Sequence, residues 1–371
     1  MYSESDLAQA VEAGVLSPDA VEAFRNHIAA RNSTPAVDEE SFRLLTGFND
    51  IFVAIAATLI LVAVGWIGSY IGGQIVGKPW RGPVEGGITV AAGAFTLAVT
   101  SWLLAEYFTR QRRMALPSII LLFGFAGGAL AGVGALFAAN LPWLAEQFNA
   151  VTEVQQQQLT GAVAAIVGVI VAFATWLHWR RFMVPITVAV GAVTAVGITI
   201  GIIMALVPSA RDYVNPIVLV AGLIVFAVAM SWDMSDLERR TRRSDVAFWL
   251  HLAAAPLIAH PVFHMLGVFD GDISVPMAAV VIALYVGFAL VALAVDRRAL
   301  LVSSLVYVLW AMYALFQSTG AVELSAALTG LVIGSALLML SAFWQPMRRG
   351  VVGLLGGLAD NLPPTRHPAL A

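Results

Sequence analysis

The sequence predicts an all-α, polytopic transmembrane helical bundle of about ten spans, and three observations support this fold class. The 371-residue chain is 60% hydrophobic and 12% charged, whereas soluble domains are roughly 45–50% apolar and about 25% charged. Its mean hydropathy is +0.85. Its apolar residues also form ten separate runs, each near the ~20 residues that cross a ~30 Å hydrocarbon core. Lipid must therefore solvate most of the chain.

The sequence pattern of residues 1–45 predicts a small cytoplasmic helical hairpin followed by a linker. Apolar residues recur at helical spacing up to Gly14, which is placed to end the first helix. Ser17 then suits the capping position of a second helix, with Pro18 at its first position and Asp19 in its first turn. We expect these two helices to precede the first span.

The apolar runs give the expected boundaries of the bundle. The predicted spans are 51–71, 86–107, 118–138, 159–178, 183–206, 214–232, 246–268, 274–295, 299–317 and 322–344. The bundle therefore covers residues 46–345, and residues 346–371 form a cytoplasmic, partly interfacial tail. The longest connection, 139–158, is expected to lie along the membrane surface as a short amphipathic piece.

Charge on the connections predicts the orientation. Seventeen of the 20 lysines and arginines fall on the side that carries the N-terminus, and only Lys78, Arg81 and Arg211 fall on the other. Positive charge on short cytoplasmic loops sets the topology of membrane proteins. The sequence therefore predicts a multi-pass protein of the inner (cytoplasmic) membrane with both termini in the cytoplasm.

The seventh predicted span, 246–268, differs from the others because its interior contains histidines and prolines. These residues are His251, His260, His264, Pro256 and Pro261. A proline removes a backbone donor and clashes with the preceding turn, and it biases the residue before it away from helical angles. We therefore expect a kinked or broken helix that lines a polar cavity near residues 252–261, because irregular backbone at membrane depth needs protein or water beside it.

Two of these histidines, His260 and His264, lie four residues apart and share one face of an ideal helix. Such a pair can bind a transition metal or a haem iron, or pass a proton. A metal would need further ligands, from His251 or from acids of the outer rim such as Asp270. The alternative is structural, with each neutral imidazole satisfied by one hydrogen bond to a neighbouring helix.

Other ionisable residues are expected at the membrane interfaces. His178 lies among tryptophans and arginines, as in an aromatic belt with snorkelling charges. Asp50 and Glu106 lie at the ends of the first two spans, where each can pair with an arginine or cap a helix.

Glycines at four-residue spacing predict close packing of several spans. They are Gly124, Gly128 and Gly132 in the third span, Gly197 and Gly201 in the fifth, and Gly330 and Gly334 in the tenth. Packing within the chain is the first interpretation and dimerisation through one such face is the alternative. The oligomeric state stays open.

The segments LAQAVEAGVLSPDAVEAFRNHI (7–28) and FNDIFVAIAATLILVAVGWIG (48–68) carry a resemblance to a known family. The chain resembles uncharacterised bacterial membrane proteins that join a cytoplasmic helical hairpin to a bundle of eight or more spans. This resemblance covers the first third of the chain and implies a fold but no activity.

Three functions are compatible with these features. The first is a transporter or permease for a small solute, with the seventh span lining its path. The second is a non-catalytic membrane scaffold or sensor that docks a cytoplasmic partner through residues 1–30. The third is binding of a metal or haem by His260 and His264. The absence of cysteine excludes thiolate sites. No motif indicates an enzyme, a cofactor or nucleic-acid binding.

Overall fold

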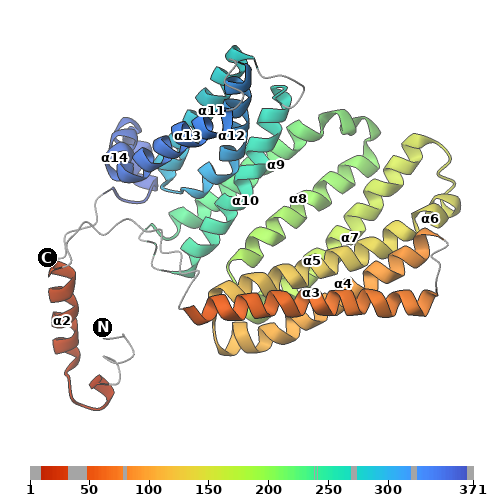
Figure 1. Cartoon of the computed structure of the whole chain (residues 1–371), viewed down its shortest axis with the longest axis horizontal. Coiled ribbons are helices and arrows are strands. Elements are labelled where there is room, and N and C mark those ends of the chain that lie inside the picture. The colour runs from red at the N-terminus through yellow and green to blue at the C-terminus, as the bar shows by residue number, and fades with distance from the viewer. Residues whose placement is uncertain are drawn as a thin grey trace. The chain divides into compact units, whose positions relative to one another are not determined.

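A computed structural model describes residues 10–31, 48–77, 82–237, 239, 241–268, 274–318 and 324–365 (Figure 1). These residues are almost entirely helical and contain no strand. Ten of the described helices are long and apolar enough to cross a membrane. The prediction of an all-α polytopic bundle is confirmed, and the protein is an integral membrane protein. The chain divides into two units, Met1–Phe42 and Arg43–Ala371.

The N-terminal unit contains the helix start that its sequence predicts. Gly14 adopts the left-handed conformation, with a φ of 70°, which favours glycine at a helix end. The side chain of Ser17 then accepts a hydrogen bond of 3.1 Å from the Ala20 amide, and α2 begins at the next residue and spans Pro18–Arg31. The linker predicted after α2 falls outside the described residues.

Six helices form the first part of the bundle. They are α3 (Phe48–Val76), α4 (Pro83–Ala105), α5 (Ala115–Ala139), α6 (Leu141–Gln147), α7 (Glu153–Phe182) and α8 (Ile186–Leu206). A π-helical turn, η1 (Glu106–Gln111), extends α4, and a 3-10 turn, η2 (Pro208–Tyr213), follows α8. The short α6 occupies part of the connection predicted to lie along the surface. That connection is shorter than predicted, because a capping box between Thr152 and Gln155 begins α7 before the glutamine run.

A second set of helices completes the chain. They are α9 (Val214–Met234), α10 (Arg242–Met265), α11 (Val275–Val295), α12 (Ala299–Ser318), α13 (Ser325–Ala342) and α14 (Trp344–Leu354), followed by the 3-10 turn η3 (Gly356–Asn361). Most of the described arginines lie in the connections after α4, α7, α9, α11 and α13 or in the helix ends next to them. The helix ends that meet these connections are called the arginine-rich side below.

Close packing at glycines joins α3, α4 and α5, and it also joins α7 and α8. An ideal Cβ at Gly128 of α5 would lie 2.6 Å from the carbonyl oxygen of Ala94 in α4. One at Gly201 of α8 would lie 2.8 Å from the Ala165 amide nitrogen in α7. A Cβ at Gly124 would meet side chains of both α3 and α4 within 3 Å, and one at Gly132 would meet a side chain of α4. The sequence prediction is correct for these four glycines, and α3 to α8 are called the glycine-packed region.

The other three glycines of the prediction do not pack in this way. A Cβ at Gly197, Gly330 or Gly334 would meet nothing within 4 Å. The spacing prediction fails here because it cannot tell which face of a helix meets a neighbour. Among the described helix glycines of α9 to α14, Gly222 alone lies in close contact with another helix.

Candidate functional site

The helix α10 is the most enclosed of the ten spans. Half of its span (50%) is buried inside the protein, against 17–41% for the others, because it packs against α8, α9 and α12. Figure 1 shows α10 beside α9 and next to the blue helices of the C-terminal part. The enclosure is uneven along the helix, because His251 is fully buried whereas His260 and His264 are exposed.

The sequence predicts a kink or a break at Pro256 and Pro261. The break does not occur, because α10 continues as one α-helix through both prolines. Pro261 has no amide hydrogen for the carbonyl of Leu257, four residues earlier. That carbonyl oxygen lies 2.8 Å from the position of an ideal Cβ at Gly222 of α9. A glycine at this point lets α9 approach the freed carbonyl, and neighbouring helices commonly compensate for prolines in membranes.

The three histidines of α10 bond to different neighbours and do not form one cluster. His260 Nδ1 lies 2.9 Å from the Tyr307 hydroxyl of α12, and His264 Nδ1 lies 3.0 Å from the side-chain amide nitrogen of Asn215 in α9. The two rings have centroids 6.1 Å apart. His251 bonds to α9 at a separate place. No group of three metal-ligating side chains occurs among the described residues, and Asp270 lies outside them.

The structure instead places His251 in a buried charge network at the arginine-rich side. Its Nε2 lies 2.8 Å from a carboxylate oxygen of Asp233, in the last turn of α9. Arg297, in the connection between α11 and α12, donates to both oxygens of the same carboxylate. The exposed fractions of His251, Asp233 and Arg297 are 0%, 1% and 2%. We call these three residues, with Ser244, the His251 network.

Local structure fixes the positions of these groups. Ser244 lies seven residues, about two helical turns, before His251 on α10. Its carbonyl and hydroxyl oxygens accept from Arg297 at 3.2 and 3.1 Å. Asp236 closes the loop between α9 and α10 by accepting from the amide and hydroxyl of Thr241, at 2.9 and 2.7 Å. The loop therefore sets the register in which Asp233 faces His251.

The hydrogen bonds define the proton positions. Asp233 accepts from the guanidinium, so its bond with His251 requires that Nε2 carry the imidazole proton. The other ring nitrogen, Nδ1, is buried and has no hydrogen-bond partner among the described residues. Such unsatisfied buried atoms are uncommon in proteins. Nδ1 is the atom that can accept a further proton.

A second network continues from the first through the adjacent residue Asp296. Its carboxylate accepts from Arg239 at 2.9 Å and from the indole of Trp344 at 2.8 Å. Arg348 of α14 forms an ion pair with it at 3.5 Å, and also donates to the carbonyls of Pro363 and Pro364. The two networks together connect α9, α10, α11, α12, α14 and the chain that follows α14.

Sequence reasoning misses most of these residues because it assigns them to short loops or to the C-terminal tail. Arg239, Arg297 and Arg348 count as determinants of orientation, and the sequence indicates no partner for them inside the bundle. Asp233 and Asp296 were not singled out, although each lies next to the predicted end of a span. An acid at that position indicates a partner within the bundle, since unpaired charges near the hydrocarbon core are costly.

The glycine-packed region also contains a buried histidine, His178, whose ring faces the bundle instead of the exposed aromatic belt that the sequence predicts. His178 is fully buried, with its ring against Phe125, Phe182 and Trp102. Among the described residues its one polar contact is long, 3.4 Å from Nδ1 to the Thr187 hydroxyl. The helix α7 continues past His178 to Phe182, and this places the ring inside the bundle.

Glu106 pairs with arginines as expected. Its carboxylate accepts from Arg181 at 2.6 and 2.9 Å and from Arg110 at 3.3 Å. These side chains are partly exposed at the arginine-rich side. Surface pairs of this kind contribute little to stability, so Glu106 is a weaker candidate for function than the His251 network.

Comparison with family models, with curated proteins and with solved structures finds no match. The resemblance to bacterial hairpin-and-bundle proteins therefore stays a prediction. The candidate site has to be interpreted from its own geometry.

Proposed function

We propose that the protein transports a small solute across the membrane and that the His251 network couples this transport to proton binding. The observation that supports the proposal is a fully buried set of ionisable groups around His251 of the most enclosed span. Ionisable residues within membrane helices are costly and mark ion or substrate pathways in many proteins. Buried ion pairs also add little net stability over apolar packing, which weakens a purely structural explanation.

The proposed coupling follows from the charges. With a neutral His251, Asp233 has one hydrogen-bonded imidazole and one guanidinium as partners. A proton on the free Nδ1 of His251 would place a second cation close to Arg297. Repulsion between the two cations would favour separation of α10 from the connection between α11 and α12. Protonation would thereby open the arginine-rich end of the bundle.

The test is transport by the purified full-length protein in vesicles that contain a pH-sensitive dye. Amino acids, sugars, organic anions and cationic drugs would be added in turn, and proton movement would be recorded after each addition. We expect one class to drive proton movement. His251→Gln should abolish it, because the amide can still donate to Asp233 but cannot take up a proton.

The matched control is His178→Phe, which alters the other fully buried histidine of the described chain. This variant should move protons as the unaltered protein does. A wild-type protein that moves no protons with any class, or a His251→Gln variant that couples normally, would contradict the proposal.

The same proposal places the arginine-rich side in the cytoplasm of a bacterial cell, as the positive-inside rule predicts. The chain has no cysteine, so single cysteines can be introduced without a background. A cysteine at Arg349 should be protected from a membrane-impermeant maleimide in intact cells, and one at Arg211 should react. The reverse pattern would overturn the orientation.

A docking function for the N-terminal unit is the second candidate, and exposed apolar side chains favour it. Val15 is 75% exposed and Leu16 is 38% exposed, next to the turn at Gly14. We propose that this surface binds a cytoplasmic protein. Val15→Asp with Leu16→Asp should abolish recovery of a specific partner by the purified unit, and failure to recover any partner with the unaltered surface would count against the idea.

A further inference from the structure

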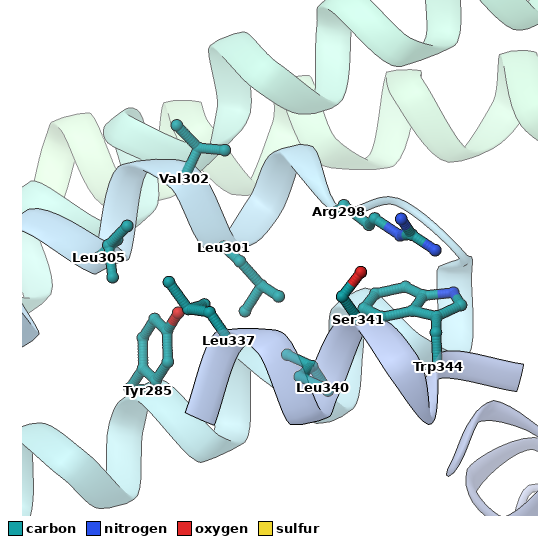
Figure 2. A pocket seen from close by; sticks show the side chains of 9 residues that line it. All are labelled: Tyr285, Arg298, Leu301, Val302, Leu305, Leu337, Leu340, Ser341 and Trp344. Atoms are coloured by element: carbon teal, nitrogen blue, oxygen red, sulfur yellow. The ribbon is translucent and has the colours of Figure 1, made fainter. Parts of the chain in front are cut away.

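A pocket separate from the His251 network opens between α11, α12 and α13. It has a volume of about 230 Å³. Five aliphatic side chains of α12 and α13 line it, and Tyr285 of α11 lies at one end. Figure 2 shows Leu301 and Leu337 near the middle of the pocket. The walls are suited to an apolar chain.

The other end of the pocket is polar and cationic. Arg298 lies there with Ser341 and Trp344, as Figure 2 shows. The Arg298 guanidinium carbon is 4.8 Å from the centroid of the Trp344 ring, so the indole face holds the cation in place. This end belongs to the arginine-rich side, because Arg298 precedes the first residue of α12.

The depth of the pocket matches one leaflet of a bilayer. Tyr285 lies ten residues before Val295, the end of α11, which corresponds to about 15 Å along a helix. Half of a ~30 Å hydrocarbon core is also about 15 Å. An occupant with its head at Arg298 would therefore place its tail at the level of the membrane centre.

We propose that this pocket binds one acyl chain of an anionic phospholipid from the surrounding bilayer, with the lipid phosphate at Arg298 and Ser341. The guanidinium supplies the charge and the forked donors that suit a phosphate, and the serine hydroxyl can donate a further bond. The aliphatic walls match the chain. A bilayer lipid is also present at high local concentration, so the pocket can fill without high affinity. Basic pockets between spans on this side commonly bind lipid head groups.

The hydroxyl of Tyr285 offers an internal check on the occupant. Its oxygen is buried and has no hydrogen-bond partner among the described residues, and Figure 2 shows it directed towards Leu337. A saturated acyl chain provides no acceptor at that depth. Removal of this hydroxyl should therefore leave the binding of a phospholipid unchanged.

The test uses phosphatidylglycerol that carries a photoreactive diazirine in the middle of one acyl chain. The full-length protein would be placed in phosphatidylcholine vesicles with a small fraction of this probe, and adducts would be mapped by mass spectrometry of fragments. We expect the main adducts within 301–305 and 337–341. Unlabelled phosphatidylglycerol should suppress them, and added phosphatidylcholine should not.

Four variants separate the parts of the site. Arg298→Gln should reduce these adducts several-fold, whereas Arg349→Gln, an exposed arginine of α14 outside the pocket, should not. Leu337→Phe fills the pocket while it retains the cation, and should reduce the adducts if Arg298→Gln fails to fold. Tyr285→Phe should change nothing.

Adducts spread evenly over the spans, equal competition by phosphatidylcholine, or unchanged labelling of both Arg298→Gln and Leu337→Phe would overturn the proposal. Competition by oleate as strong as that by phosphatidylglycerol would assign the pocket to a free fatty acid instead. A loss of adducts in Tyr285→Phe would indicate an occupant with a polar group at that depth, and would also overturn it.

Discussion

In the glycine-packed region, α3 to α8, helices meet where side chains are small, and backbone lies against backbone at positions such as Gly128 and Gly201. In α9 to α14, which we call the charge-linked region, helices are joined by the two carboxylates Asp233 and Asp296 and their buried partners. The first kind of contact depends on shape alone. The second depends on ionisation as well, so contacts of this kind can respond directly to protons.

This contrast predicts different responses to removal of a single group. Packing at a glycine tolerates small changes at a graded cost, whereas a buried ion pair leaves an unpaired charge when one partner is removed. Four substitutions test the comparison, from the largest expected effect to the smallest.

Asp233→Ala should have the largest effect, because it leaves Arg297 buried without its carboxylate. The expected loss is about 3–5 kcal/mol of unfolding free energy, visible as a large drop in the thermal midpoint of the purified protein. Arg349→Ala, at an exposed residue of the same side, should leave the midpoint unchanged. If Asp233→Ala were as stable as that control, the charge-linked region would not be held by its ion pairs.

His251→Phe should have an intermediate effect. The carboxylate of Asp233 would lose one donor but keep Arg297, and a hydrogen bond to a charged group contributes about 1.5–3 kcal/mol. The ring centroids of Phe226 and His251 are 5.2 Å apart, so a phenylalanine at position 251 would pack against another aromatic ring. Thermal unfolding would measure the change, and an increase in stability would show that the imidazole is not a net stabilising partner.

Gly128→Ala tests the glycine-packed region. Its Cβ would lie 2.6 Å from the carbonyl oxygen of Ala94, so α4 and α5 would have to move apart, and overpacking of this kind costs about 1–3 kcal/mol. Gly127→Ala is the matched control, because a Cβ there meets nothing within 4 Å. Equal thermal midpoints for the two variants would mean that close approach at Gly128 is not needed.

The sequence predicts the ten spans well because the signal is local, about twenty apolar residues in a row. It does not predict the candidate site, because the site joins residues such as Asp233 and Arg297 that lie 64 positions apart. The sequence identifies His251 as an intramembrane histidine, but it assigns Asp233 and Arg297 to loops. The packing partner of an ionisable side chain is a property of the tertiary structure.

The predicted break at Pro261 fails for a similar reason. Local chemistry says only that the Leu257 carbonyl loses its donor. The neighbour of that carbonyl in the structure is Gly222 of α9, 39 residues before Pro261 in the sequence, and local chemistry does not reveal this contact. Glycine spacing likewise predicts close contacts at Gly124, Gly128, Gly132 and Gly201, but it cannot show that Gly330 faces away from its neighbours.

His178→Phe should have the smallest effect and provides the sharpest comparison with His251→Phe, because both histidines are fully buried. The Nε2 of His178 has no hydrogen-bond partner among the described residues, and the Thr187 hydroxyl is 3.4 Å from Nδ1. Three aromatic rings surround it, so phenylalanine fits and removes a poorly satisfied polar group.

Replacing such a group by an apolar one of similar shape is nearly neutral or stabilising, so we expect a thermal midpoint equal to or above that of the unaltered protein. Thr187→Val should be equally harmless, since it removes the other end of the long contact. A loss as large as that of His251→Phe would show that His178 has a polar role as well. The two regions would then differ in packing, but not in their dependence on a buried imidazole.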